Sequence, residues 1–460
     1  MRLRSLAVCL GFTASWMVSG CASGPAVYEK VLKELPASPE APPPSGSVPS
    51  ASKSSLTFED CFVLALGRNE RLAITGEDYF QATLLRHRAW AALSPEMTLR
   101  GTYLRQEDVA PPPGTVTQRF NDPSRLDYGL RVRQPLFNGF KDVYALRQIG
   151  ETIQARRSTL LQERQNLLLN VAGAFYGALQ AQQEVSTLEE SVRLQQERLR
   201  EVQARQRLGL ARKTEVLLVE TQATSVEARL VRARNALQTL RERLGLVIGA
   251  PVERPLVDSV QDGPLPADLG ALVQAARAGR NDLKALEASV KAAQAQLGVV
   301  RGEFAPSVDL TGNYYLRRSG VSSDIKWDVL FTLDYPFFQG GVSRARYREA
   351  ASKLRQARLL AQGLRRQIDV EVETAYLDMK ASDALLKTLE AGFKAAEENY
   401  RLIQEEYRQG IGTNLEVLTA YTFFENARLD LDRERLNRKV LYLRLQTVTG
   451  GLPVRVTSDE

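Results

Sequence analysis

Residues that hold metal ions or act as catalytic bases are scarce in this chain. Its 460 residues include one histidine, His87, with three cysteines and four methionines. So small a set leaves almost no room for a histidine-based metal site or a Ser-His-Asp hydrolase. It also argues against zinc ribbons, iron–sulfur clusters and soft-metal relays. We therefore expect a protein that is not an enzyme and that holds no metal ion and no cofactor.

Charge of one sign is not in large excess either. The chain carries 61 lysines and arginines against 54 aspartates and glutamates, which gives a formal net charge of +7. Such a balance is typical of a mixed, solvated surface and does not indicate a nucleic-acid partner. Hydrophobic residues make up 44% of the chain. This share excludes a disordered polyelectrolyte and is sufficient for a sizeable core.

Long apolar runs are rare, and the one that matters lies at the N-terminus. Two arginines precede an apolar stretch over residues 6–18, which is too short to span a bilayer comfortably. Two small residues then precede Cys21. This order predicts a secretory signal peptide over residues 1–20, which is cleaved off and is not part of the mature fold.

Cys21 ends the sequence V-S-G-C, which resembles a bacterial lipobox. The resemblance implies that Cys21 becomes the first mature residue and carries a covalent lipid such as palmitate; the alternative is an ordinary cleavage site with a chance cysteine. Only Cys61 would then stay free, so no intrachain disulfide would form, and its apolar helix face predicts a core position. Residues 21–55 are rich in proline and serine, which predicts a lipidated, semi-extended tether.

An internal tandem duplication is the strongest pattern in the sequence. Residues 135–140 (PLFNGF) match residues 336–341 (PFFQGG), and further matching pairs share the same offset of 201 residues. A single duplication of this length indicates one structural unit used twice. We expect a first repeat over residues 56–250 and a second over residues 251–460, which ends in a short C-terminal tail.

Each repeat has the same predicted order of elements: a helix, two strands, a very long helix and a shorter helix that returns. The very long helices are almost free of proline and glycine, and their apolar residues recur at spacings of three and four, as in a coiled coil. Each is expected to turn at a glycine, so each repeat contains a helical hairpin. The expected helices are 57–92, 140–208 and 214–246 in the first repeat, and 269–303, 341–409 and 414–449 in the second.

Two segments in each repeat alternate between apolar and polar residues. In the last of the four, Trp327, Val329, Phe331 and Leu333 are separated by single residues, the first of which is Asp328, and Asp334 follows Leu333. Alternation over roughly ten residues predicts transmembrane β-strands, although a soluble sheet with one wet face would give the same pattern. The charged residues on the polar side are Arg100, Arg131, Arg133, Asp309, Asp328 and Asp334.

Four strands are too few to form a membrane-spanning structure alone. A closed barrel needs about eight strands at least, and open strand edges are not tolerated in lipid. The chain must therefore oligomerise, and three copies would supply twelve strands. The six charged residues named above would then line a water-filled lumen.

These features together resemble the TolC-type outer-membrane efflux proteins. The resemblance covers about residues 56–455, and its sharpest motifs are the two hairpin turns, 207–217 (RLGLARKTEVL) and 408–418 (RQGIGTNLEVL). It implies a mixed α/β membrane protein, in which a homotrimeric 12-stranded transmembrane β-barrel is continued by a long periplasmic α-helical barrel. It also implies residence in the outer membrane of a Gram-negative bacterium, lipid-anchored and extending into the periplasm.

The resemblance implies a function as well. The chain would be the passive exit duct of a tripartite efflux pump and would work with a periplasmic adaptor protein and an inner-membrane transporter. The lipobox resembles that of members serving resistance-nodulation-division pumps. Two alternatives stay open: the outer-membrane channel of a type I protein-export system, and a structural coiled-coil lipoprotein of the periplasm.

The family also suggests where a gate would lie. An acidic residue at the position of Glu416 faces the pore at its constricted periplasmic end, and three copies would form a cation-binding ring. Glu215 is the matching residue of the first repeat, and Thr419 occupies the family's second acidic position, which weakens a second ring. From the residues alone, both glutamates fit equally well as favourable helix starts.

The hairpin turns would be the docking surface for the adaptor, although glycine-capped helix turns would look the same. We expect Arg212, Lys213 and Arg408 to help hold a closed tip. The expected docking residues are Arg207, Gly209, Leu210, Arg408, Gly410, Ile411, Gly412 and Thr413.

Overall fold

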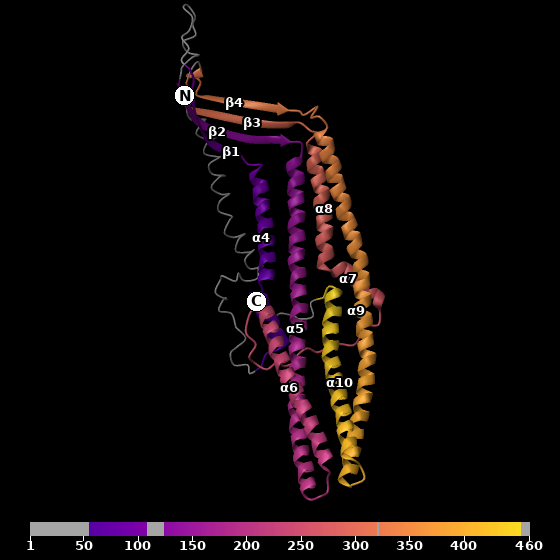
Figure 1. Cartoon of the computed structure of the whole chain (residues 1–460). Coiled ribbons are helices and arrows are strands. Elements are labelled where there is room, and N and C mark those ends of the chain that lie inside the picture. The colour runs from indigo at the N-terminus through magenta and orange to yellow at the C-terminus, as the bar shows by residue number, and fades with distance from the viewer. Residues whose placement is uncertain (1–54, 108–123, 320–321, 452–460) are drawn as a thin grey trace, which may run out of the picture. The chain divides into compact units, whose positions relative to one another are not determined.

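The computed structural model describes residues 55–107, 124–319 and 322–451. The expected signal peptide, Cys21, nearly all of the tether and the C-terminal tail lie outside the described residues. The described chain forms two compact units, and unit 2 comprises residues 78–159 and 282–364. Unit 1 comprises the remaining described residues, and the element labels below follow Figure 1.

The first helical region of each half is broken in two, so the prediction of one continuous helix over 57–92 and over 269–303 is wrong. The helices are α3 (Phe58–Arg68) and α4 (Glu70–Ala91), then α7 (Leu269–Gly279) and α8 (Asn281–Gly302). At the first break Asn69 is extended, and its side-chain oxygen accepts the backbone N–H of Leu72 at 3.0 Å. Asparagine competes well for such N-terminal helix positions, which explains the break.

The four predicted strands form one antiparallel sheet in unit 2. They are β1 (Glu96–Arg105), β2 (Ser124–Asn138), β3 (Ser307–Arg317) and β4 (Trp327–Asp334), in the order β1-β2-β3-β4 (Figure 1). Within the described residues, β1 and β4 each have a strand neighbour on one side only.

The apolar face of this sheet is exposed in the single chain. Leu99 of β1 is 74% exposed and Phe331 of β4 is 63% exposed. Large hydrophobic residues in a contiguous exposed patch indicate contact with a partner or a membrane rather than with water.

Two helical hairpins follow the strands. The first pairs α5 (Lys141–Arg207) with α6 (Lys213–Ile248), and the second pairs α9 (Val342–Arg408) with α10 (Asn414–Val448) (Figure 1). The helices α5 and α9 each contain 67 residues, or roughly 100 Å at 1.5 Å per residue. The predicted bounds agree with these helices to within about two residues.

The core of unit 1 lies where α3 packs on the first hairpin. Phe58 of α3 meets Phe175 of α5 edge to face, with ring centroids 5.9 Å apart, and both side chains are fully buried. Cys61 lies in this same core, as the sequence predicts. Burial raises the pKa of its thiol to about 12, so it stays protonated at neutral pH.

Each hairpin is also held together along its length by apolar and aromatic contacts. Leu188 of α5 packs with Val226 and Leu230 of α6. In the second hairpin the rings of Tyr400 and Tyr421 lie 5.3 Å apart. No helix within the described ranges is both long enough and apolar enough to cross a membrane.

Candidate functional site

The two hairpin turns of unit 1 have the same backbone structure. Gly209 and Gly410 both adopt positive φ, +73° and +80°. In each turn the residue after the glycine donates its backbone N–H to a carbonyl five residues back: Leu210 to Arg205 at 2.8 Å, and Ile411 to Glu406 at 3.0 Å. This is a Schellman cap, which stops a helix at a left-handed residue and favours glycine there.

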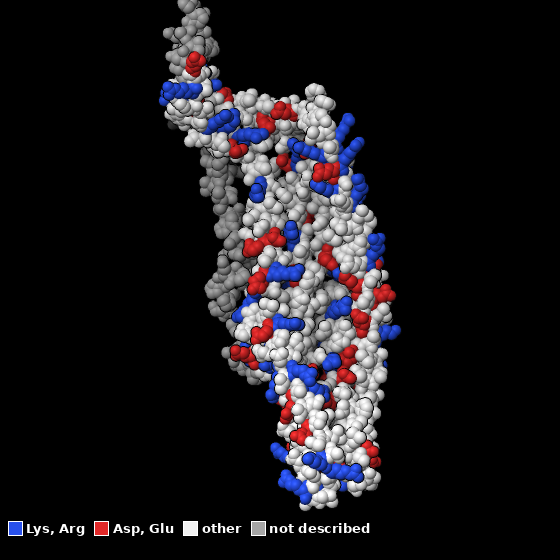
Figure 2. Space-filling model, viewed as in Figure 1, with Lys and Arg blue, Asp and Glu red and all other residues white. Residues whose placement is uncertain are grey.

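The structure brings the predicted docking residues together at these turns. Leu210 and Ile411 are each 75% exposed, so neither side chain serves as a core contact within the chain. Arginine and lysine side chains lie at the surface of the turns, as the blue atoms at the lower end of the molecule in Figure 2 show. An exposed apolar residue with basic neighbours is suited to binding another protein; adaptor docking itself stays a prediction.

Glu416 forms a reciprocal cap with Thr413 at the start of α10. The carboxylate accepts the backbone N–H of Thr413 at 2.7 Å, and the Thr413 hydroxyl accepts the backbone N–H of Glu416 at 3.3 Å. These hydrogen bonds to the charged form hold the pKa of Glu416 below its ordinary value. Within one chain, Glu416 therefore acts as a helix start, and a pore-lining role stays a prediction.

The other two predicted gate residues also make local contacts. Glu215 accepts the backbone N–H of Arg212 at 3.3 Å, which is half of the same capping arrangement at the start of α6. The hydroxyl of Thr419 donates to the carbonyl of Leu415 one turn back, at 2.8 Å. Both contacts lie within the first turns of their own helices. They therefore do not test whether these residues line a gate.

Contacts between the two hairpins are made by a residue that the sequence analysis did not select. Arg198 of α5 donates from Nε and Nη2 to Asn414 Oδ1, at 3.1 and 2.9 Å. Its guanidinium lies 4.0 Å from the ring centroid of Tyr407 at the end of α9, which is a cation–π contact. Arg198 therefore joins the first hairpin to both helices of the second.

Three other basic residues were expected to hold the closed tip. Within the part of the chain that the structure describes, Arg212, Lys213 and Arg408 take part in no ion pair. They are exposed at the turns, so any such contact would have to come from another copy or from a partner.

A buried charged network also joins the hairpins, farther from the turns. Glu425 of α10 is only 3% exposed. Its carboxylate pairs with Arg229 of α6 at 2.9 Å and accepts the hydroxyl of Ser191 of α5 at 2.5 Å. Tyr421 donates to the same serine at 2.8 Å, and burial raises the pKa of its phenol to about 12.

The position of Glu425 in the sequence indicates part of this network. Glu425 follows Val417 and Tyr421 at spacings of eight and four, so it falls on the buried stripe of α10. A carboxylate in an apolar stripe requires a buried partner. Its spacing alone could have identified Glu425, but not Arg229 or Ser191.

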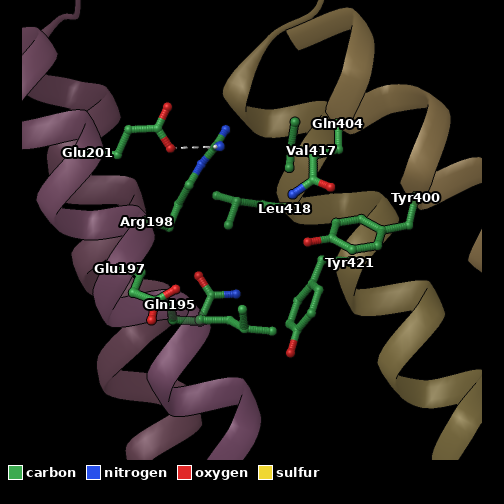
Figure 3. A pocket seen from close by; sticks show the side chains of 10 residues that line it. Gln195, Glu197, Arg198, Glu201, Tyr400, Gln404, Val417, Leu418 and Tyr421 are labelled. Carbon is green, nitrogen blue, oxygen red and sulfur yellow. Dashed lines mark hydrogen bonds and ion pairs between the residues drawn. The ribbon is translucent and has the colours of Figure 1, made fainter. Parts of the chain in front are cut away.

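A cavity of about 160 Å³ lies between the hairpins close to the turns. In Figure 3, Gln195, Arg198 and Glu201 of α5 face Tyr400 of α9 and Tyr421 of α10. The side-chain oxygen of Gln195 is buried without a hydrogen-bond partner among the described residues. The cavity is large enough to hold water that would satisfy this oxygen.

The polar face of the sheet in unit 2 carries all six charged residues predicted for it. Residues directly opposite each other in antiparallel strands share a face, and the register pairs Thr98 with Arg131 and Asn313 with Asp328. Arg131 Nε donates to Asn313 at 3.2 Å and Arg133 pairs with Asp309 at 3.1 Å, so contacts between neighbouring strands link this face. That this face lines a lumen stays a prediction.

The fold and these sites define a class of protein. The model of the outer membrane efflux protein family matches residues 84–250 and 272–451, and the chain therefore belongs to that family. The family and the fold are those of outer-membrane efflux and secretion channels, which are transport proteins and not enzymes.

Two relatives and one solved structure illustrate the range of the family. The chain is 25% identical over 425 residues to the alkaline protease secretion protein AprF of Pseudomonas aeruginosa, and the match covers 86% of each chain. It is 23% identical over 336 residues to the outer membrane efflux protein BepC of Brucella suis, over 72% of this chain and 73% of BepC. The crystal structure of CusC shares the fold, with a TM-score of 0.76 at 19% identity, and covers 86% of this chain and 92% of CusC.

Proposed function

We propose that the chain forms the homotrimeric exit duct of a tripartite efflux pump in the outer membrane of a Gram-negative bacterium. The observation that carries this proposal is the sheet of unit 2, with one charged face and one exposed apolar face. Leu99 and Phe331 on the apolar face would contact lipid, and Arg131 and Asp309 on the other would contact water in a lumen. A soluble sheet would have to cover its apolar face with another element.

The two edges of the sheet that are unpaired among the described residues require pairing with other copies of the chain. Backbone N–H and C=O groups at a free strand edge have no partner in lipid, so β1 of one copy would pair with β4 of the next. Three copies would close a 12-stranded barrel, and the helical hairpins would continue it as an α-helical barrel in the periplasm. The repeated order of elements supports an origin by tandem duplication, in which both halves supply two strands and one hairpin.

The partners are a periplasmic adaptor and an inner-membrane transporter. The exposed turns around Leu210 and Ile411 would bind the adaptor, and Glu416 would form the gate ring when three copies meet. The lipid on Cys21 would hold the chain at the membrane in addition to the barrel. Neither the ring nor the lipid is required for the barrel to form, so each can be tested separately.

Transport by a deletion strain tests the proposal. Loss of the gene should raise the accumulation of small-molecule dyes in cells, and the wild-type chain should restore efflux. A chain that lacks residues 207–217 should assemble without restoring efflux, because the adaptor could not dock. Unchanged dye accumulation in the deletion strain would count against an efflux role.

A protein-secretion duct is the second candidate, and one specific observation favours it. The relative AprF, matched over 86% of this chain, is named for protease secretion. Secretion should then fail in the deletion strain while dye accumulation stays unchanged. Measuring both in the same strain distinguishes the two functions.

A further inference from the structure

The polar face of the sheet contains a cavity whose wall is rich in arginine. The cavity has a volume of about 260 Å³ and lies over β2 and its two neighbours in the sheet, β1 and β3. Three arginines line it, Arg100, Arg131 and Arg318, against one aspartate, Asp127. Figure 2 shows blue and red side chains close together over the strands.

A glycine lies in the wall of this cavity. Gly129 of β2 lies directly between Arg100 of β1 and Tyr315 of β3 in the register. A Cβ at this position would lie 2.5 Å from the backbone oxygen of Tyr314, so no larger residue fits without moving a strand. The close approach of β2 and β3 therefore requires glycine at this point, which lies in the wall of the cavity.

Two of the three arginines lack a carboxylate partner. Within the described ranges, no carboxylate lies at ion-pair distance from Arg100 or Arg131. Arg131 is nevertheless held in place, because its Nε donates to Asn313 Oδ1 at 3.2 Å. This bond leaves both terminal nitrogens of the guanidinium available to a ligand, in the fork geometry that suits carboxylates and phosphates.

The nearby acidic groups are already engaged. Asp127 accepts the backbone N–H of Ser319 at 2.6 Å. Asp328 accepts from Asn313 at 2.7 Å and from Tyr315 at 3.0 Å, and Arg318 lies 3.7 Å from its carboxylate. Each of these carboxylates therefore has polar partners of its own, and neither forms an ion pair with Arg100 or Arg131 within the described ranges, although Asp328 interacts electrostatically with Arg131 at longer range.

We propose that this cavity is an oxyanion-binding site, in which Arg100 and Arg131 bind a carboxylate or phosphate group of a solute. The volume suits one such group with a small part of the molecule attached to it. If the polar face lines a lumen, as the proposed function holds, three copies of the site form a ring of arginines. The ring lies toward the end of the barrel at which β1 and β3 end and β2 and β4 begin. Such a ring attracts anions and slows their passage.

Citrate, a small tricarboxylate, is a suitable probe. Purified trimers in planar bilayers should be blocked by citrate, and the half-blocking concentration should rise at least tenfold in the double variant Arg100→Gln/Arg131→Gln. Arg131→Lys alone keeps the charge but loses the fork, so it should weaken the block and leave the ratio of chloride to potassium permeability almost unchanged.

Arg133→Gln is the matched control. It removes one charge from the same face, on the strand that carries Arg131, but Arg133 is already paired with Asp309 at 3.1 Å. Its half-blocking concentration should stay within twofold of the wild type. A block that is unchanged in the double variant, or equally weakened by Arg133→Gln, would overturn the site.

Calorimetric titration of citrate into detergent-solubilised protein separates this inference from the proposed function. Binding that is lost in the double variant supports the site even if no channel is recorded, and the absence of a channel then contradicts the duct. A channel that conducts in the wild type, with no citrate binding in either assay, supports the duct and overturns the site.

Discussion

The sheet of unit 2 and the parts of the hairpins that lie in unit 1 distribute their side chains in opposite ways. In the hairpins the apolar residues Leu188 and Val226 face each other, and exposed charges cover the outside. In the sheet the large apolar residue Leu99 is 74% exposed, whereas Arg133 and Asp309 contact each other on the opposite face. The two regions are therefore suited to different surroundings: water around the hairpins and, in the proposed duct, lipid against one face of the sheet.

The same contrast applies to isolated charges. Glu425 is buried in the hairpins and is fully engaged with Arg229 and Ser191. Arg100 lies on the polar face of the sheet with no ion-pair partner among the described residues. A buried charge needs a partner to be tolerated, whereas a charge facing a water-filled space can remain available for binding.

The largest expected effect comes from breaking the buried pair. Arg229→Leu leaves the Glu425 carboxylate buried without its cation and should lower the free energy of unfolding by about 3 kcal/mol. Arg229→Leu/Glu425→Leu should regain most of this loss, because the buried charge is gone. Thermal unfolding of the helices by circular dichroism in detergent measures both variants.

Arg193→Leu is the control for that experiment. Arg193 pairs with Glu197 one turn away at 3.3 Å, and both side chains are more than half exposed. Loss of this ion pair should lower the free energy of unfolding by less than about 1 kcal/mol. If the double variant were no more stable than Arg229→Leu, the lost stability would come from packing and not from the charge.

The second effect concerns the two faces of β1. Leu99→Arg places a charge on the apolar face. If that face meets lipid, the change should lower the stability of the assembled barrel by about 2–4 kcal/mol per copy. Thr102→Arg places the same charge on the polar face of the same strand, opposite Asp127 in the register, and should assemble normally. Heat-resistant oligomers in outer-membrane fractions measure the outcome. Equal yields of the two variants would mean that both faces are in water.

A smaller effect is expected at the turns. Gly410 has a φ of +80°, where a side chain costs about 1–2 kcal/mol. Gly410→Ala should therefore lower the stability of the second hairpin, as measured by hydrogen exchange of its amides near the turn. Gly392→Ala within helix α9 has no atom within 4 Å of the added Cβ and should raise stability by about 1 kcal/mol.

The smallest effect distinguishes the two roles of Glu416. Its pKa in one chain lies below the ordinary value of 4.5 because of its bonds to Thr413. The helix start is therefore stabilised above pH 4.5, and the stabilisation disappears as the pH falls through the lowered pKa. Carboxylates of neighbouring copies would instead raise the pKa. NMR titration of labelled Glu416 in the assembled protein should give a value above 4.5 if it forms a gate ring.

The sequence predicts the long helices and the strands well because both have strong periodicity. Residues 342–408 contain few helix breakers, and strand alternation fixes which face each residue joins. The breaks at Asn69 and Arg280 were missed, since one asparagine is a weak local signal within a helical pattern. The contacts of Arg198 were missed for another reason: an exposed helix face offers many arginines, and only the packed hairpins decide which one reaches Asn414.

Crosslinking between strand edges tests the central claim most directly. Cysteine in place of Leu99 on β1 would be combined in turn with cysteine in place of Trp327, Val329, Phe331 or Leu333 on β4. The native Cys61 is buried and should not react. A barrel of three copies predicts that at least one pair gives a ladder of crosslinked species that ends at the trimer. A series in which every pair stays monomeric, stops at dimers or continues beyond three would contradict the 12-stranded barrel.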